Sequence, residues 1–82
     1  MKLLWTERGW SDYPFWQSVD LKMLARINEL LKDVQRGPFQ GIEMSGWWSR
    51  RITQEHRLIY RVSGSGDAQA IEIAACRFHY GR

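Results

Sequence analysis

Apolar residues recur at helical spacing in the first half of the chain. Between about residues 20 and 35 they form one stripe, widened by Met23 and Leu30, and charged residues mostly lie outside it. The stripe consists of Leu24, Ile27, Leu31 and Val34. Steps of three and four predict an amphipathic helix that packs on one side. The dipeptide Gly37-Pro38 is typical of a helix end.

A short strand and a first helix are predicted before this stripe. Residues 2–5 read as a strand, and Thr6 has a side chain suited to a helix N-cap. Trp10 and Tyr13 follow at a helical step. Pro14 lacks a backbone N–H, so we expect the first helix to kink or end early there.

The second half of the chain has the pattern of strands and turns. Residues 39–46 read as a loop bounded by glycines. Residues 47–53 and 57–62 predict two strands joined in a hairpin. Residues 63–67, Ser-Gly-Ser-Gly-Asp, are a strong turn signal before a last strand from residue 70 to residue 78 or beyond. We therefore expect an antiparallel meander.

Strand parity assigns side chains to the two faces of this sheet. Within residues 57–62 the apolar set is expected to meet the helices and consists of Leu58, Tyr60 and Val62. The alternate set lies on the other face and consists of Arg57, Ile59 and Arg61. In the last strand, Ile71, Ile73 and Ala75 share a side. Arg77 and His79 continue this parity, but a bulge near the strand end would exchange these last positions.

These elements predict one α+β domain over residues 1–82, in which two N-terminal helices pack on an antiparallel sheet of about four to five strands. Hydrophobic residues make up 44% of the chain and include five tryptophans, which is material for a core without disulfides or metal. The lone cysteine, Cys76, excludes an internal disulfide and is expected to be a small buried residue in a reducing compartment. One cysteine with His56 and His79 cannot supply a conventional zinc site. Neither a signal peptide nor a membrane span is evident, so we expect a cytoplasmic protein without membrane contact.

Positive charge gathers in the second half of the chain. The formal net charge is +3, and arginine entirely replaces lysine in that half, at Arg50, Arg51, Arg57, Arg61, Arg77 and Arg82. Arginine binds phosphate bidentately, which indicates an anionic partner such as nucleic acid or an acidic protein. The alternative is that these arginines are solvated or paired with carboxylates such as Glu55, Glu72 or Asp67. His56 lies in a tight turn, where it is structural or faces RNA.

Four segments together resemble a known family. They are MKLLWTERGWSDYPFW at the start, INELLKDVQRGPF at the end of the second helix, WWSRRITQEHRLIYRV, and the closing AACRFHY. In this order they are similar to the YoeB/Txe branch of the RelE/ParE toxin superfamily. The resemblance implies a toxin of a type II toxin-antitoxin system: a ribosome-dependent endoribonuclease that cleaves messenger RNA in the acceptor site. It also implies no metal cofactor, a homodimer, and a cognate antitoxin of the YefM/Axe kind.

The resemblance assigns chemical roles to individual residues. Metal-free RNA cleavage needs a base for the ribose 2′-hydroxyl, cations for the phosphorane, and an acid for the departing 5′-oxygen. His79 matches the family's acid, with Tyr80 as the aromatic beside it. Arg51 and Arg57 match the arginines that stabilise the phosphate. Further RNA or phosphate contacts are expected from Arg50, Arg77 and Trp48.

The base is assigned less directly, because the family's Lys-Pro-Glu-Pro-Leu-type stretch is replaced here by residues 41–46. Glu43 lies in the corresponding connection, and Glu55 matches a family glutamate before the histidine and arginine. The shortened connection leaves a second reading open, in which a catalytically weakened toxin-fold protein binds antitoxin or ribosome without efficient cleavage. A third reading follows the ParE side of the superfamily, with the basic face on a gyrase. The EHRLIY and RFHY motifs favour the RNA-cleaving branch.

Overall fold

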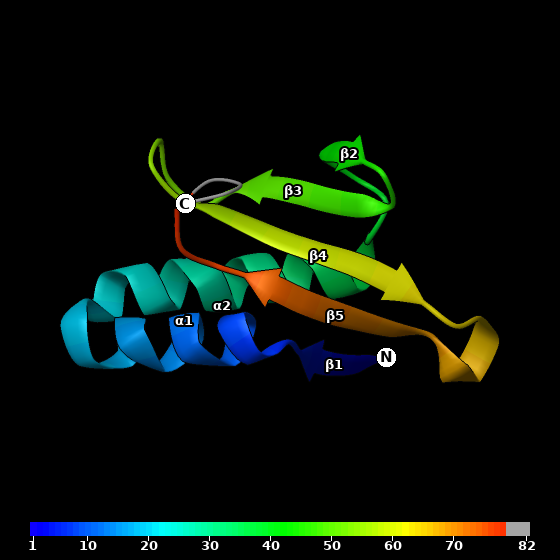
Figure 1. Ribbon diagram of the computed structural model, residues 1–82, viewed down its shortest axis with the longest axis horizontal. Helices are drawn as coiled ribbons and strands as arrows, with labels where there is room; N and C mark the ends of the chain where they lie inside the picture. The colour runs from blue at the N-terminus through cyan, green and yellow to red at the C-terminus, as the bar shows by residue number, and fades with distance from the viewer. Residues whose placement is uncertain (79–82) are drawn as a thin grey trace.

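A computed structural model describes residues 1–78 of the chain as two helices and a five-stranded sheet (Figure 1). The elements in chain order are β1 (Lys2–Trp5), α1 (Glu7–Val19), α2 (Leu21–Arg36), β2 (Ile42–Met44), β3 (Trp47–Arg51), β4 (Arg57–Ser63) and β5 (Ala70–Ala75), with a 3-10 turn at Gly66–Ala68 before β5. Nearly all of these elements agree with the sequence patterns. The α+β class, with two N-terminal helices on a sheet, is confirmed.

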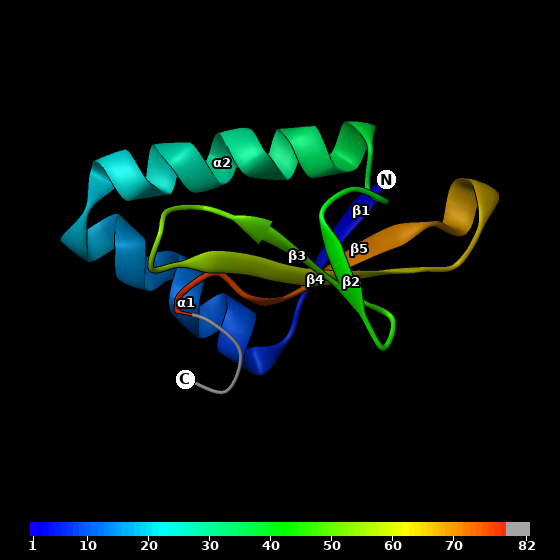
Figure 2. The same cartoon turned by 90° about the horizontal axis from the view of Figure 1, so that it is seen from above.

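The sheet has the strand order β1-β5-β4-β3-β2. Strands β2 to β5 pair antiparallel with their neighbours, as the predicted meander requires. The pairing of β1 differs, because it joins β5 in parallel with Leu3 opposite Ile71. After β1 the chain forms both helices and then returns to the sheet as the antiparallel strands β2 to β5. Strands β1 and β5 point the same way (Figures 1 and 2). The sheet is therefore mixed at this one edge.

Helix α1 continues through Pro14, contrary to the expected kink or early end. Thr6 caps its start by accepting a 3.1 Å hydrogen bond from the N–H of Gly9, as predicted. Downstream of the proline, the buried Trp16 ties the helix to the sheet side of the molecule through a 2.9 Å bond to the carbonyl of Cys76. Tertiary contacts of this kind offset the loss of one helical donor at a proline.

Helix α2 follows directly, with Asp20 as both the end of α1 and the N-cap of α2. Its carboxylate accepts from the N–H groups of Lys22 and Met23. The predicted stripe is the buried face of the helix: Ile27 and Val34 are fully buried, and Leu31 is nearly so. The core joins this stripe to Leu58, Tyr60, Ile71 and Ile73 from the sheet.

Residues 39–46 are not wholly irregular, because they contain the short edge strand β2. Ser45 and Gly46 both have positive φ, at 53° and 85°, which is the geometry of a tight two-residue hairpin turn. Glu43 stabilises this turn by accepting a 2.6 Å bond from the N–H of Gly46. The sequence signal was weak because three residues make too short a run to show alternation.

Strand β5 ends at Ala75, three residues earlier than the shortest expectation. Its pairing with β4 shifts between Ile59 and Tyr60, because Ile59 lies opposite Ala75 whereas Tyr60 lies opposite Ile73. The shift leaves Ala74 as an extra residue, which is the expected bulge. Beyond it Cys76 is fully buried within the core. Because of this bulge, the side chains that follow it exchange the faces to which they point.

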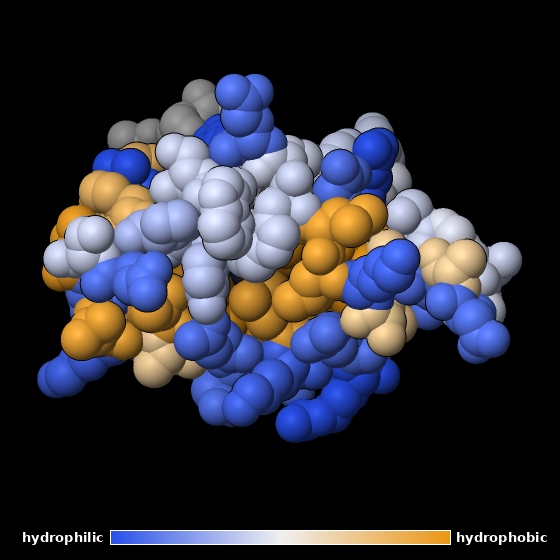
Figure 3. All heavy atoms as spheres, turned by 90° about the horizontal axis from the view of Figure 1, so that it is seen from below, coloured by the Kyte–Doolittle hydropathy of each residue, from blue (hydrophilic) through white to orange (hydrophobic). Residues whose placement is uncertain are grey.

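Both helices lie on one side of the sheet, so its other face is free of helices (Figures 1 and 2). On the side seen from below, hydrophobic residues reach the surface between a pale region of intermediate hydropathy and a band of hydrophilic side chains (Figure 3). None of the helices within residues 1–78 is long and apolar enough to cross a membrane.

Candidate functional site

Arg51 and Arg57 are direct partners across the antiparallel pair of β3 and β4. Their side chains share the sheet face that the helices leave free, because the adjacent residues Arg50 and Leu58 form a pair on the helix side. Arg51 is exposed and Arg57 half-buried. Within residues 1–78 neither guanidinium has a carboxylate at ion-pair distance. Two like charges placed opposite each other destabilise a sheet, so this pair is typical of a site for an anion.

Ser49 holds one of these arginines in place. Nε of Arg57 donates a 2.5 Å hydrogen bond to Oγ of Ser49, whose residue is only 1% exposed. This bond occupies Nε and leaves the terminal nitrogens of the guanidinium for a ligand. Sequence reasoning assigned no role to Ser49. Strand parity was the available signal, because Ser49 shares a face with Arg51 two positions later.

Trp48 and Arg50 lie on the opposite, helix-facing side of β3. Arg50 donates from Nη2 to Oδ2 of Asp33 on α2 at 2.8 Å, and its side chain is only 16% exposed. Burial raises the pKa of the Tyr60 hydroxyl above its usual 10.0, and the nearby charge of Arg50 opposes this rise. Trp48 packs edge-on against Phe39. The structure thus separates Trp48 and Arg50 from Arg51 and Arg57.

Arg77 also lies apart from the arginine pair. Its guanidinium stacks over the ring of Phe15 on α1, 3.7 Å from the centroid. The carbonyl of Arg77 accepts a 3.1 Å bond from Nη2 of Arg8, also on α1. Arg77 therefore fastens the segment after β5 to α1 rather than extending the face that holds Arg51 and Arg57.

The two candidate bases lie in different places. Glu43 is the cross-strand partner of Trp48 and shares its side of the sheet, away from Arg51 and Arg57. Glu55 lies in the loop between β3 and β4, two residues before Arg57, with a side chain 73% exposed. Its Oε1 is 3.8 Å from Nε2 of His56. Of the two carboxylates, only Glu55 is at the end of the sheet where the arginine pair lies.

The end of the described chain lies beside Arg57. The N–H of Arg57 donates a 3.1 Å bond to the carbonyl of Phe78, and the N–H of Phe78 donates a 2.8 Å bond to Nδ1 of His56. His79 and Tyr80, the predicted acid and its neighbour, lie outside the described residues. The residue before them in the sequence, Phe78, is bonded to the backbone of Arg57.

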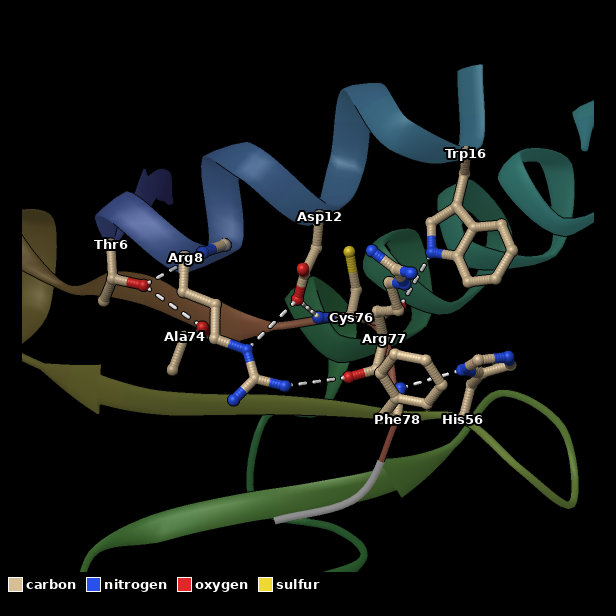
Figure 4. Close-up of polar contacts among 10 residues, drawn as sticks. Thr6, Arg8, Asp12, Trp16, His56, Ala74, Cys76, Arg77 and Phe78 are labelled. Atoms are coloured by element: carbon tan, nitrogen blue, oxygen red, sulfur yellow. Dashed lines mark hydrogen bonds and ion pairs between the residues drawn. The ribbon is translucent and has the colours of Figure 1, made fainter. Parts of the chain in front are cut away.

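Side chains of α1 hold the segment that leads to this point (Figure 4). Oδ2 of the buried Asp12 accepts a 3.1 Å bond from the N–H of Cys76, and Trp16 donates to the carbonyl of the same residue. The sequence offers a signal for these contacts only in hindsight, since an acid four residues before a tryptophan shares its helix face.

The thiol of Cys76 is not suited to act as a nucleophile. Burial, reinforced by the charge of Asp12 and opposed by that of Arg8, raises its pKa to about 12. A thiol with so high a pKa is not a nucleophile near neutral pH. Among the described residues, no three His, Cys, Asp or Glu side chains gather where they could hold a metal ion.

Comparison with known proteins gives one consistent result. Residues 5–80 match the family described as YoeB-like toxin of bacterial type II toxin-antitoxin system. Toxin YoeB of Escherichia coli K12 is 48% identical over 88 residues, covering 98% of this chain and all of the relative. Toxin YoeB of Synechocystis is 44% identical over 90 residues, with both chains fully covered. Both alignments are longer than this chain of 82 residues, so the relatives have positions without a counterpart here.

Solved structures agree with the sequence comparison. A YoeB/ParE toxin from Agrobacterium tumefaciens has a TM-score of 0.88 at 50% identity, covering 98% of this chain and all of its own. A YoeB dimer and a YoeB-YefM complex, both from Staphylococcus aureus, have TM-scores of 0.81 and 0.79 at 36% and 34% identity. Each covers 98% of both chains.

Proposed function

This chain belongs to the family of YoeB-like toxins of bacterial type II toxin-antitoxin systems, and on that premise we propose that it is an endoribonuclease that cleaves messenger RNA in the acceptor site of the ribosome. The observation that carries the proposal is the pair of arginines, Arg51 and Arg57, opposite each other on the free face of the sheet. Their charges have no carboxylate partner within residues 1–78, and Phe78, the residue before His79, is bonded to the N–H of Arg57.

The proposed reaction is a transesterification within the RNA. A base removes the proton of the ribose 2′-hydroxyl, and the 2′-oxygen attacks the adjacent phosphorus. The bond from phosphorus to the 5′-oxygen then breaks, and an acid protonates that oxygen. The products are a 2′,3′-cyclic phosphate and a 5′-hydroxyl end. In this scheme His79 is the acid, because imidazole, with an ordinary pKa near 6.5, keeps a protonated fraction at neutral pH.

Arg51 and Arg57 stabilise the charge that develops on the pentacoordinate phosphorus. A forked guanidinium matches the equatorial oxygens of a phosphorane better than an ammonium does. Donors fixed in advance contribute most to catalysis, because they need no reorganisation during the reaction. The bond from Arg57 to Ser49 provides this fixed orientation. Arg51 has no such bond among the described residues and is expected to close on the RNA when it binds.

Glu55 is the base that the geometry supports best. It is exposed at the Arg57 end of the sheet, whereas Glu43 is on the other side and bonds the hairpin turn. The contact of Glu55 with Nε2 of His56 also suits a carboxylate, because Nε2 carries the imidazole proton when Nδ1 accepts the hydrogen bond from the N–H of Phe78.

Two partners follow from the relatives. The structure of a YoeB-YefM complex supports a cognate antitoxin of the YefM kind, and the structure of a YoeB dimer supports a homodimer. An antitoxin would have to cover the unpaired charge of Arg51 and Arg57 to silence the site, so we expect acidic residues in the segment that reaches this face.

The second candidate function is a toxin-fold protein that binds antitoxin or ribosome without efficient cleavage. It is favoured by one observation, namely that the connection before β3 forms a short hairpin with Glu43 turned from the arginine pair. One experiment separates the two functions. Programmed ribosomes are mixed with wild-type protein or with His79→Ala, and rapid cleavage within the acceptor-site codon is expected only for the wild type. A message left uncut at saturating wild-type protein would exclude the endoribonuclease and leave only the binding function.

A further inference from the structure

The last described segment, residues 76–78, has left the regular ladder of the sheet and is held largely by side chains. Asp12 and Trp16 bind the two backbone groups of Cys76, as described above. Phe78 is held differently, because its N–H bonds the imidazole of His56 and its carbonyl bonds the N–H of Arg57. The two neighbours His56 and Arg57 therefore fix both backbone groups of the residue that precedes His79.

His56 is itself rigidly placed. Its carbonyl accepts bonds from the N–H groups of Ile52 and Thr53, at 2.9 and 3.1 Å, and its N–H donates to Oγ1 of Thr53 at 3.2 Å. The residue is only 7% exposed. Its ring packs edge-on against Trp16, with centroids 4.8 Å apart, and lies 5.2 Å from the ring of Phe78. The imidazole is therefore held rigidly, with Nδ1 pointing at the N–H of Phe78.

The backbone of Phe78 needs such support. Its φ of +65° lies in the left-handed region, which costs a residue other than glycine about 1 kcal/mol or more. This conformation sets the direction in which the chain leaves toward His79. Because consecutive Cα atoms are about 3.8 Å apart, a change in the backbone conformation of Phe78 moves the residue that follows it.

We propose that His56 is a positioning residue for the acid His79, because its bond to Phe78 fixes the residue that precedes His79 next to Arg57; this inference rests on the function proposed above. The imidazole of His56 acts as an acceptor at Nδ1 and so does not compete with His79 as the acid. Arg57 and His56 both bond the backbone of Phe78. This residue therefore links the strand of the phosphate-binding arginine to the residue before the proposed acid.

The experiment uses the full chain and two substitutions of His56. His56→Phe keeps a ring between Trp16 and Phe78 but has no acceptor, whereas His56→Asn can place Oδ1 where Nδ1 lies. We expect His56→Phe to lower kcat for ribosome-dependent cleavage by about 100-fold, the loss typical of a misplaced catalytic group, without changing KM for ribosomes. His56→Asn should restore most of this loss. Val34→Ala, a core change on α2, is the control for lowered stability and should leave kcat unchanged.

A double-mutant cycle distinguishes positioning from a purely structural role. If His56 acts through His79, then adding His56→Phe to His79→Ala causes no further loss of the low residual rate that His79→Ala keeps at long incubation. Amide hydrogen exchange supplies a readout that does not depend on cleavage, since His56→Phe should speed exchange at Phe78 and His56→Asn should not.

Three results would overturn the inference. An active His56→Phe variant with wild-type kcat would refute the positioning role alone, and so would a loss of equal size in the His79→Ala background. Wild-type protein that leaves the message uncut would refute the proposed function and the positioning role together.

Discussion

Nε of Arg57 donates a 2.5 Å hydrogen bond to Oγ of Ser49, eight residues earlier on the neighbouring strand. The bond is largely shielded from water, because Ser49 is 1% exposed. It fixes the guanidinium that we assign to the scissile phosphate.

Ser49→Ala is therefore predicted to reduce the cleavage rate although Ser49 touches no RNA in our scheme. A hydrogen bond to a charged group contributes about 1.5 to 3 kcal/mol, so its loss corresponds to a rate lower by about 10-fold or more. Single-turnover cleavage on programmed ribosomes measures the effect. A rate equal to the wild type would show that Ser49 does not orient Arg57.

The arginine pair is predicted to lower stability while it supports activity. Arg51→Ala removes one of two like charges that face each other, so it should raise the free energy of unfolding by about 0.2 to 1 kcal/mol. The same change should slow cleavage by about 100-fold to 1,000-fold, the typical loss for one transition-state donor. Urea unfolding and the ribosome assay measure the two effects.

Arg61→Ala is the matched control, because Arg61 lies on β4, the strand of Arg57, but is paired with Glu72 at 2.6 Å and lies over the ring of Trp47. We expect near wild-type cleavage for this variant. An equal loss of activity for Arg61→Ala and Arg51→Ala would mean that general positive charge, rather than the pair, is what matters.

The base assignment predicts unequal effects for the two glutamates. Glu55→Gln should lower kcat by about 100-fold to 10,000-fold, as expected for loss of a general base. Glu43→Gln weakens a turn on the other side of the sheet and should cause the smaller loss. The comparison needs only the rates of the two variants at saturating ribosomes. A larger loss for Glu43→Gln would reverse the assignment.

Gly9 is predicted to be intolerant of any side chain. A Cβ at this position would lie 2.3 Å from the carbonyl oxygen of Ile73 on β5, which is backbone and cannot move aside. Gly9→Ala should therefore lower the free energy of unfolding by about 1 to 3 kcal/mol, despite the better helix propensity of alanine. Ser11→Ala, on the exposed side of α1, should not destabilise the protein. Equal unfolding curves for both variants would contradict the packing of α1 on β5.

The buried thiol predicts a pH dependence of stability. The pKa of Cys76 is raised from its usual 9.0 to about 12, so the folded protein keeps the proton that the unfolded chain loses. Stability is fully present below pH 9 and falls as the pH rises from 9 toward 12, by on the order of 1 kcal/mol at pH 10. Urea unfolding at pH 8 and pH 10 measures the loss, which Cys76→Ala should reduce. A wild-type loss as small as that of Cys76→Ala would contradict the burial of the thiol.

The sequence predicted the helices and the central hairpin because these depend on local patterns. The stripe on α2 and the parity of Leu58 and Tyr60 are read directly from spacing. The parallel pairing of β1 with β5 was missed, since it joins residues nearly seventy positions apart. Pro14 was weighed by its local cost alone, whereas the bond of Trp16 to the carbonyl of Cys76 helps to keep α1 continuous.

The candidate site divides in the same way. Arg51 and Arg57 were identified by resemblance, and parity places them on one face. Arg50 shares their charge and segment, but its partner Asp33 lies on α2, and only the packing of α2 on the sheet reveals this contact. The role of His56 depends on Phe78, twenty-two residues later, so no local pattern announces it.

The central claim is that Arg51, Arg57 and His79 form an RNA-cleaving site. The most direct test is to sequence the cut ends of a message on programmed ribosomes and to identify their chemistry. We predict cleavage within the acceptor-site codon that leaves a 2′,3′-cyclic phosphate and a 5′-hydroxyl, and no more than a low residual rate with Arg57→Ala or His79→Ala. Uncut message with the wild type, or the same ends at the same rate with both variants, would contradict the account.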